Sequence, residues 1–228
     1  MLCYQIPGTG KLNVHKTHGD LMKLFDSHCH LDDRAYEKDI DSVISRANTA
    51  GISKIMIVGI DRKSSAKAVK IAETYPECYA SVGVHPHDAK ECSETVINFL
   101  KDLSENNKVK AWGEIGLDFN RMFSPKDVQE KWFIKQLETA LDLGLPLIFH
   151  ERDSEGRFLE ILKSYAKDGI NGVMHCFSGN RKELKEYLDL GLHIGVTGIV
   201  TILGRGEELR KLVPMININR LLIETDAP

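Results

Sequence analysis

Short apolar runs alternate with longer amphipathic stretches along this chain, from residue 24 to the last residue. The apolar runs are typical of buried strands and predict eight of them, over 24–28, 54–59, 78–84, 110–115, 146–150, 172–176, 193–197 and 221–226. The stretches between them predict helices over 37–50, 64–75, 93–105, 126–143, 155–167, 181–190 and 206–213. Four of these helices are followed by a glycine, as helix C-termini prefer: Gly51, Gly144, Gly169 and Gly191.

Eight strands alternating with helices indicate an α/β fold, and eight is the number that closes a TIM (β/α)8 barrel. An open doubly wound sheet is the alternative, but no glycine-rich phosphate loop follows the first strand. The side chains that do chemistry in such a barrel lie at the C-terminal ends of the strands. Those strand ends are therefore the place to search for a site.

The length of 228 residues suits one domain. We expect that domain over 22–228, with residues 1–21 as an N-terminal extension outside the fold. Residues 1–21 lack the apolar segment of a secretory signal, and no stretch of the chain approaches the length of a membrane span. We therefore expect no membrane contact, and nothing in the pattern requires an obligate protein partner.

The cysteines and the net charge limit the class of protein further. Five cysteines are scattered along the chain without a Cys-x-x-Cys pair, which predicts reduced thiols and a cytoplasmic protein, or a nuclear one in a eukaryote. The formal net charge of −3 excludes a broadly basic protein. If the protein handles nucleic acid, it must use local cations and a metal rather than a long-range positive field.

The first candidate site is the pair His28 and His30, which closes the first predicted strand. Side chains alternate along a strand, so these two imidazoles should point the same way and Cys29 the other way. Two such imidazoles can converge on one metal ion. The alternative for this pair taken alone is two ordinary loop histidines.

Later strands end in further side chains of the kinds that bind metals. Glu114 ends the fourth strand, His150 the fifth, His175 the sixth and Asp226 the eighth. With the first pair these make four histidines and two carboxylates, enough for two divalent ions that share a carboxylate. Taken singly, Glu114 or Asp226 could cap a helix, and His150 or His175 could be a core histidine. A Cys176–His175 nucleophile is disfavoured, because neighbours on a strand face opposite ways.

Six ordered motifs together resemble the TatD family of metal-dependent deoxyribonucleases, most closely its TatD branch. They are His28-Cys29-His30-Leu31-Asp32, Gly83-Val84-His85-Pro86-His87, the segment from Gly113 to Arg121, His150-Glu151-Arg152-Asp153, His175-Cys176-Phe177-Ser178-Gly179 and Glu224-Thr225-Asp226-Ala227-Pro228. The resemblance implies a TIM barrel of the metal-dependent hydrolase type. It also implies hydrolysis of DNA phosphodiester bonds, typically as a 3′-5′ exonuclease.

The resemblance also implies roles for individual residues. His28 and His30 would bind a first metal, His150 and His175 a second, and Glu114 would bridge the two. Asp226 would hold the attacking water while it touches the first metal, and His85 would contact phosphate or support a metal ligand. The cofactors would be two divalent ions (Mg, Mn or Zn), and the partner would be DNA, single-stranded or at its ends.

Arginines that follow strand ends are candidates for binding flanking phosphates, because a guanidinium can make bidentate contacts with phosphate oxygens. Arg152 is the strongest of them and Arg121 a second. Glu151 departs from the family, which commonly has a small residue or Cys there, and a carboxylate facing the cleft would repel phosphate. Family members also continue beyond the position of Pro228, so we expect a C-terminally truncated barrel that lacks its last covering helix.

Two other functions are compatible with the same barrel. A small-molecule amidohydrolase or lactonase is the first, although such enzymes often bridge their metals with a carboxylated lysine where this chain has Glu114. An inactive scaffold protein is the second, against which the complete ligand set argues.

Overall fold

The computed structural model describes residues 23–228, so the extension expected over 1–21 lies outside the described residues. The described chain forms one sheet of eight parallel strands, each paired with the next in sequence. The strands are β1 (Leu24–Cys29), β2 (Ile52–Val58), β3 (Cys78–Val82), β4 (Val109–Asp118), β5 (Leu147–Arg152), β6 (Gly172–Met174), β7 (His193–Val196) and β8 (Leu221–Ile223). None of the helices in this described part combines the length and hydropathy needed to cross a bilayer.

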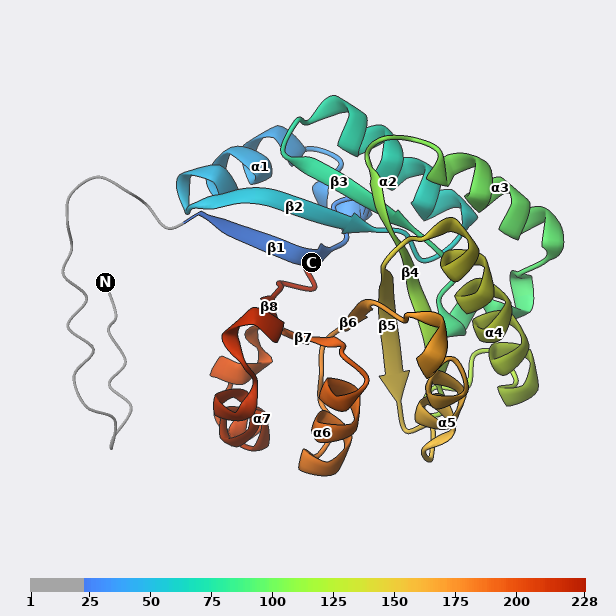
Figure 1. Ribbon diagram of the computed structural model, residues 1–228. Helices are drawn as coiled ribbons and strands as arrows, with labels where there is room; N and C mark the ends of the chain where they lie inside the picture. The colour runs from blue at the N-terminus through green and yellow to red at the C-terminus, as the bar shows by residue number, and fades with distance from the viewer. Residues whose placement is uncertain (1–22) are drawn as a thin grey trace.

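The first and last strands approach each other and nearly close the sheet into a barrel. Beyond the end of β8, the Asp226 N–H donates to the His28 carbonyl at 2.9 Å, and the His30 N–H donates to the Ala227 carbonyl at 2.8 Å. Figure 1 shows the strands on the inside and the helices on the outside of this barrel. The expected TIM (β/α)8 architecture is confirmed.

Seven α-helices connect the strands and cover the outside of the barrel. They are α1 (Ile40–Thr49), α2 (Arg62–Thr74), α3 (Glu94–Ser104), α4 (Lys126–Leu143), α5 (Arg157–Ser164), α6 (Arg181–Asp189) and α7 (Glu207–Leu212). Each lies within two or three residues of its predicted bounds, and α4 matches them. Between 224 and 228, after β8, the described chain forms no helix, and Ile223 is 43% exposed on the outside of that strand.

Local sequence explains where the helices begin and end. The Asp61 side chain accepts from the Ser64 N–H at the start of α2, and Asn180 and Glu183 cap α6 reciprocally. Such caps satisfy N–H groups that have no partner inside the helix. Gly144 after α4 has φ +66°, a left-handed conformation that glycine adopts at little cost.

The core has two layers, because strands of a parallel barrel are apolar on both faces. A large layer between strands and helices contains Ile55, Ile57 and Trp112. A smaller layer fills the barrel interior and is built from alternating positions such as Met56, Val58, Ala111, Ile148 and Val173. The interior at the C-terminal ends of the strands holds polar side chains instead.

An irregularity in β4 turns Glu114 into the barrel. Trp112 pairs with Leu147 and Ile115 with Phe149, so β4 carries one extra residue between these pairs. Ala111 and Glu114 consequently both face the interior, although strict alternation would place them on opposite faces. The strand also continues to Asp118 rather than ending at residue 115 as expected.

Candidate active site

A cavity of about 570 Å³ opens where the strands end. Five of the six expected metal ligands line it, and each lies in a strand or in the segment that follows one: His30, Glu114, His150, His175 and Asp226. The sixth, His28, is fully buried beneath them. The structure therefore brings together all six side chains, although 198 positions separate the first from the last along the chain.

Three imidazoles surround one carboxylate oxygen at the β1–β8 side of the cavity. Asp226 Oδ1 lies 3.8 Å from His28 Nε2, 3.6 Å from His30 Nε2 and 3.5 Å from His175 Nε2. The two Nε2 atoms of His28 and His30 are 3.3 Å apart. Two nitrogens bound to the same zinc at 2.0–2.1 Å in tetrahedral geometry would be about 3.3 Å apart. The donor set and its spacing fit a divalent ion.

The two carboxylate oxygens of Glu114 face different histidines. Oε2 lies 3.4 Å from His28 Nε2, whereas Oε1 lies 2.8 Å from His150 Nδ1. The side chain is almost completely buried. This is the arrangement that a carboxylate needs if each of its oxygens is to contact a different ion.

Charges inside the cavity are strongly coupled. Burial raises the pKa of Glu114, but the imidazoles packed around it, with His150 Nδ1 at 2.8 Å, outweigh burial and hold that pKa well below its usual value. Burial lowers the pKa of His150, but hydrogen bonds to the carboxylates of Asp118 and Glu114 raise it to about 9. The carboxylates are therefore ionised at neutral pH, which favours cations in the cavity.

Glu224 and Cys176 belong to the site, and the sequence did not identify their places in it. Glu224 is buried and accepts from the Cys176 N–H at 2.6 Å. The expectation that Cys176 faces away from His175 is wrong, because β6 ends at Met174 and Cys176 has φ +46°. Its thiol lies close enough to a nitrogen of His175 and an oxygen of Asp226 to form a possible metal-binding group. The only signal for this position of the thiol is that β6 ends at Met174, two residues before Cys176.

A second group missed by the sequence analysis lies at the β3–β5 side. Asp118 Oδ2 is 2.7 Å from His87 Nε2 and 3.3 Å from His150 Nε2. His85, expected to contact phosphate or to support a ligand, is buried and places its Nε2 3.6 Å from Glu114 Oε1. Burial lowers the pKa of His85 to about 3. Its Nδ1 accepts from the His87 N–H, so the neutral ring carries its proton on Nε2.

The two candidate phosphate-binding arginines lie in different places. Arg152 lines the cavity, whereas Arg121 is exposed and is not among the lining residues. The backbone N–H of Arg121 donates to Asp118 at 2.8 Å. Glu151 also lines the cavity, but its Oε1 accepts from the N–H and the hydroxyl of Ser154. One of its two carboxylate oxygens is therefore held by local hydrogen bonds.

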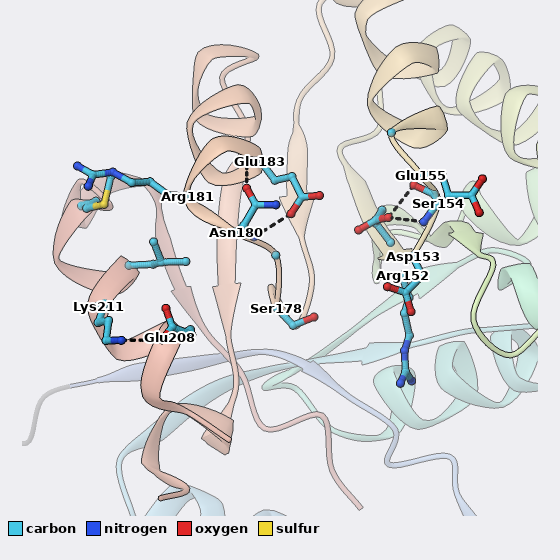
Figure 2. A pocket seen from close by; sticks show the side chains of 15 residues that line it. Arg152, Asp153, Ser154, Glu155, Ser178, Asn180, Arg181, Glu183, Glu208 and Lys211 are labelled. Atoms are coloured by element: carbon cyan, nitrogen blue, oxygen red, sulfur yellow. Dashed lines mark hydrogen bonds and ion pairs between the residues drawn. The ribbon is translucent and has the colours of Figure 1, made fainter. Parts of the chain in front are cut away.

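A larger cavity of about 990 Å³ adjoins the first and shares Glu151, Arg152 and Ser178 with it. Figure 2 shows it between the Asn180–Glu183 pair at the start of α6 and the Ser154–Glu155 loop before α5, with Glu208 and Lys211 of α7 on a third side. Acidic side chains outnumber basic ones in its lining. It widens the approach to the site without adding a positive surface.

Comparisons of sequence and of structure lead to the same group of proteins. The family model described as TatD related DNase matches residues 25–228. A 3′-5′ ssDNA/RNA exonuclease TatD of a Rahnella species is 44% identical over 206 residues, which cover 90% of this chain and 78% of the relative. A solved TatD homologue of Escherichia coli matches with a TM-score of 0.83 and 32% identity, over 90% of this chain and 79% of its own. A solved TatD-family hydrolase of Entamoeba histolytica matches with a TM-score of 0.81 and 33% identity, over 90% and 74%.

Proposed function

This chain belongs to the TatD-related DNase family, and we propose that it hydrolyses phosphodiester bonds, removing nucleotides from the 3′ end of single-stranded DNA. The observation that carries this proposal is the convergence of four histidines and two carboxylates on one cavity. Two curated relatives, 44% and 42% identical to this chain, carry the name of a 3′-5′ exonuclease of single-stranded DNA and RNA. RNA is therefore the second polymer to test.

The proposed ligands form two sets joined by one carboxylate. His28, His30 and Asp226 hold a first divalent ion, and His150 and His175 hold a second. Glu114 bridges them, for which its two oppositely directed oxygens give support. Imidazole with carboxylate suits Zn or Mn, and Mg prefers oxygen ligands, so these three ions are the candidates. When bound, the ions would lower the pKa of a water and neutralise charge on the scissile phosphate.

The residues around the ligands have supporting roles in the proposal. Asp226, whose side chain is 38% exposed, orients the attacking water and accepts its proton. Burial raises the pKa of Asp226, but the close imidazoles of His175 and His30 outweigh it and hold that pKa below its usual value. His85 directs its Nε2–H toward Glu114 and a phosphate oxygen beside it, and Arg152 binds a flanking phosphate at the mouth of the cavity.

The proposed setting is a cytoplasmic enzyme whose catalytic domain spans 22–228. Support for a reducing compartment comes from the free thiols of Cys29, Cys78, Cys92 and Cys176. The net charge of −3 means that attraction of a polyanion must come from the ions and a few arginines.

The experiment is incubation of the purified chain with 5′-labelled single-stranded DNA, duplex DNA and RNA, with Mg²⁺ or Mn²⁺ and with a chelator. We expect a metal-dependent ladder of products shortened from the 3′ end. Dihydroorotate and lactones are offered in parallel, because an amidohydrolase or lactonase on the same barrel would turn these over instead. Turnover of a small molecule with every polynucleotide intact would overturn the proposal, and so would metal-loaded protein without activity on any substrate.

A further inference from the structure

A continuous row of contacts crosses the cavity from Asp226 to His87. It passes through His28, Glu114, His150 and Asp118, with successive separations of 3.8, 3.4, 2.8, 3.3 and 2.7 Å. Asp226, the proposed acceptor of the water's proton, and His87 are therefore the two end members of this row, and both line the cavity. The row is the observation from which the inference starts.

His87 is held firmly at its end of the row. Its Nε2 lies 2.7 Å from Oδ2 of Asp118, whose side chain is 1% exposed. Asp118 Oδ1 in turn accepts from the N–H groups of Asn120 and Arg121, so the carboxylate cannot rotate away. The His87 side chain is 24% exposed and lines the cavity, and within residues 23–228 its Nδ1 has no hydrogen-bond partner. One ring nitrogen is anchored and the other is available.

A metal ion is a poor explanation for this end of the cavity. His85, His87 and His150 are close enough to be considered as a metal-binding group. However, His85 Nδ1 already accepts from the His87 N–H at 3.1 Å. His87 Nε2 lies 2.7 Å from Asp118 Oδ2, which is the distance of a hydrogen bond. The cluster is held together by hydrogen bonds.

We propose that His87 is the proton donor to the leaving oxygen of the phosphodiester, and that Asp118 positions it. The proposal rests on the hydrolytic function proposed above. In an in-line displacement the attacking and leaving oxygens lie on opposite sides of phosphorus. With the water at Asp226, the proposal has the leaving oxygen meet His87, which lines the same cavity. A buried carboxylate that holds one nitrogen of an imidazole fixes the orientation of the ring, as in a catalytic triad.

The step balances as a hydrolysis. The water oxygen forms a bond to phosphorus and gives its proton to Asp226. The bond from phosphorus to the leaving oxygen breaks, and its electron pair stays on that oxygen. The oxygen takes the proton from His87 Nδ1 and departs as an alcohol. Asp226 then loses its proton to solvent and His87 regains one, so that one water is consumed and both side chains are restored.

The test compares two single-stranded DNA substrates in single-turnover assays. One has its natural terminal linkage, and in the other sulfur replaces the bridging oxygen that leaves. A thiolate needs no proton to depart, because a thiol has a pKa of about 8.5. We expect His87→Gln to slow the natural linkage by about 100-fold or more, the usual contribution of a general acid, and the sulfur linkage by less than about threefold. The matched control is His193→Gln, which alters a histidine at the opposite end of the barrel and should change neither rate.

Each other outcome overturns the proposal. Equal slowing of both linkages would mean that His87 acts on binding or structure, and no slowing would mean that it plays no part. A wild-type chain that cleaves neither linkage would overturn the nuclease function itself, and the proton donor with it. If His87→Gln lowers the melting temperature below that of the assay, His87→Asn is measured in its place.

Asp118 has a test of its own because it acts through His87. Asp118→Asn should slow the natural linkage and spare the sulfur linkage, which a purely structural defect would not do. The double variant with His87→Gln should be no slower than His87→Gln alone, since residues that act as a unit are not additive. Additive losses, or equal slowing of both linkages by Asp118→Asn, would contradict the assigned role.

Discussion

Glu224 Oε1 lies 3.0 Å from His175 Nδ1; both side chains are buried, and His175 lines the cavity whereas Glu224 does not. Gly195 makes room for this carboxylate, because a Cβ at that position would lie 2.6 Å from either oxygen. The contact leaves the other ring nitrogen of His175, Nε2, directed at Asp226. A carboxylate behind a metal-binding histidine fixes the ring and its tautomer and raises its basicity.

Glu224→Gln should therefore weaken metal binding without removing a ligand. We expect the dissociation constant for Mn²⁺ or Zn²⁺ to rise by about 10–100-fold, as is usual when such a supporting partner is lost. Titration against a chelating dye measures it, with Glu105→Gln, an exposed surface acid, as the matched control. Unchanged affinity would show that the ring of His175 needs no support from Glu224.

The metal-free protein should lose stability as the pH rises from neutral to alkaline. The pKa of His150 is raised from 6.5 to about 9 between its two carboxylates. A group with a raised pKa in the folded state contributes stability that is fully present below its unfolded pKa and lost as pH rises through the folded value. Urea unfolding of chelator-treated protein at pH 6, 7.5 and 9.5 should show a falling free energy of unfolding. A flat profile over that range would contradict the charge arrangement described for the cavity.

Metal affinity should show the opposite trend with pH. An ion can bind His150 only after displacing a proton from it, so affinity should rise between about pH 6.5 and 9. For each proton displaced the gain is about tenfold per pH unit. Calorimetry in buffers of different ionisation enthalpy counts the protons released. Binding that releases no proton below pH 9 would mean that His150 is not a ligand.

Gly116→Ala should be far more damaging than Gly144→Ala, although both glycines have positive φ, +149° and +66°. A Cβ at Gly116 would lie 1.8 Å from the His150 carbonyl oxygen, whereas none of the described residues comes within 4 Å of one at Gly144. We expect a loss of roughly 1–2 kcal/mol for Gly144→Ala, from the left-handed backbone alone. For Gly116→Ala we expect roughly 3 kcal/mol or more, because β4 and β5 must separate. Urea unfolding of both variants gives the comparison, and equal losses would contradict it.

Substitution of the two candidate arginines should affect DNA binding to different extents. Arg152→Ala removes a cation from the cavity lining and should raise KM for single-stranded DNA by about tenfold, the effect of one charged hydrogen bond. Arg121→Ala should change KM by less than about twofold, since its side chain does not line the cavity. The slope of the logarithm of the DNA-binding constant against the logarithm of the salt concentration should become shallower by about one for Arg152→Ala. It should not change for Arg121→Ala. Equal effects of both variants would place the substrate strand elsewhere.

The periodicity of the sequence predicted the barrel, and the strand ends pointed to six side chains that the structure brings together. Parallel strands that are buried on both faces appear in the sequence as continuous apolar runs. Both end residues of α4 were predicted correctly because Gly144 ends the helix. Alternation alone could not predict the extra residue in β4, which depends on how close β4 and β5 approach at Gly113 and Gly116.

The residues that contact the proposed ligands were harder to predict than the proposed ligands themselves. His87 and Asp118 are 31 positions apart, and only the fold brings them into contact. Glu224 sat in a recognised motif, but its contact with His175 depends on the space left by Gly195. The orientation of Cys176 was predicted wrongly because the alternation of side chains along β6 was assumed to continue beyond Met174. The strand ends there and the backbone turns.

The most direct test of the central claim is anomalous scattering from crystals of the chain grown with Mn²⁺. The account predicts two peaks at the C-terminal mouth of the barrel, one among His28, His30 and Asp226 and one between His150 and His175, with Glu114 contacting both. Ligand distances should be about 2.0–2.3 Å. Crystals that scatter anomalously at other sites but show no peak beside Glu114 would contradict it.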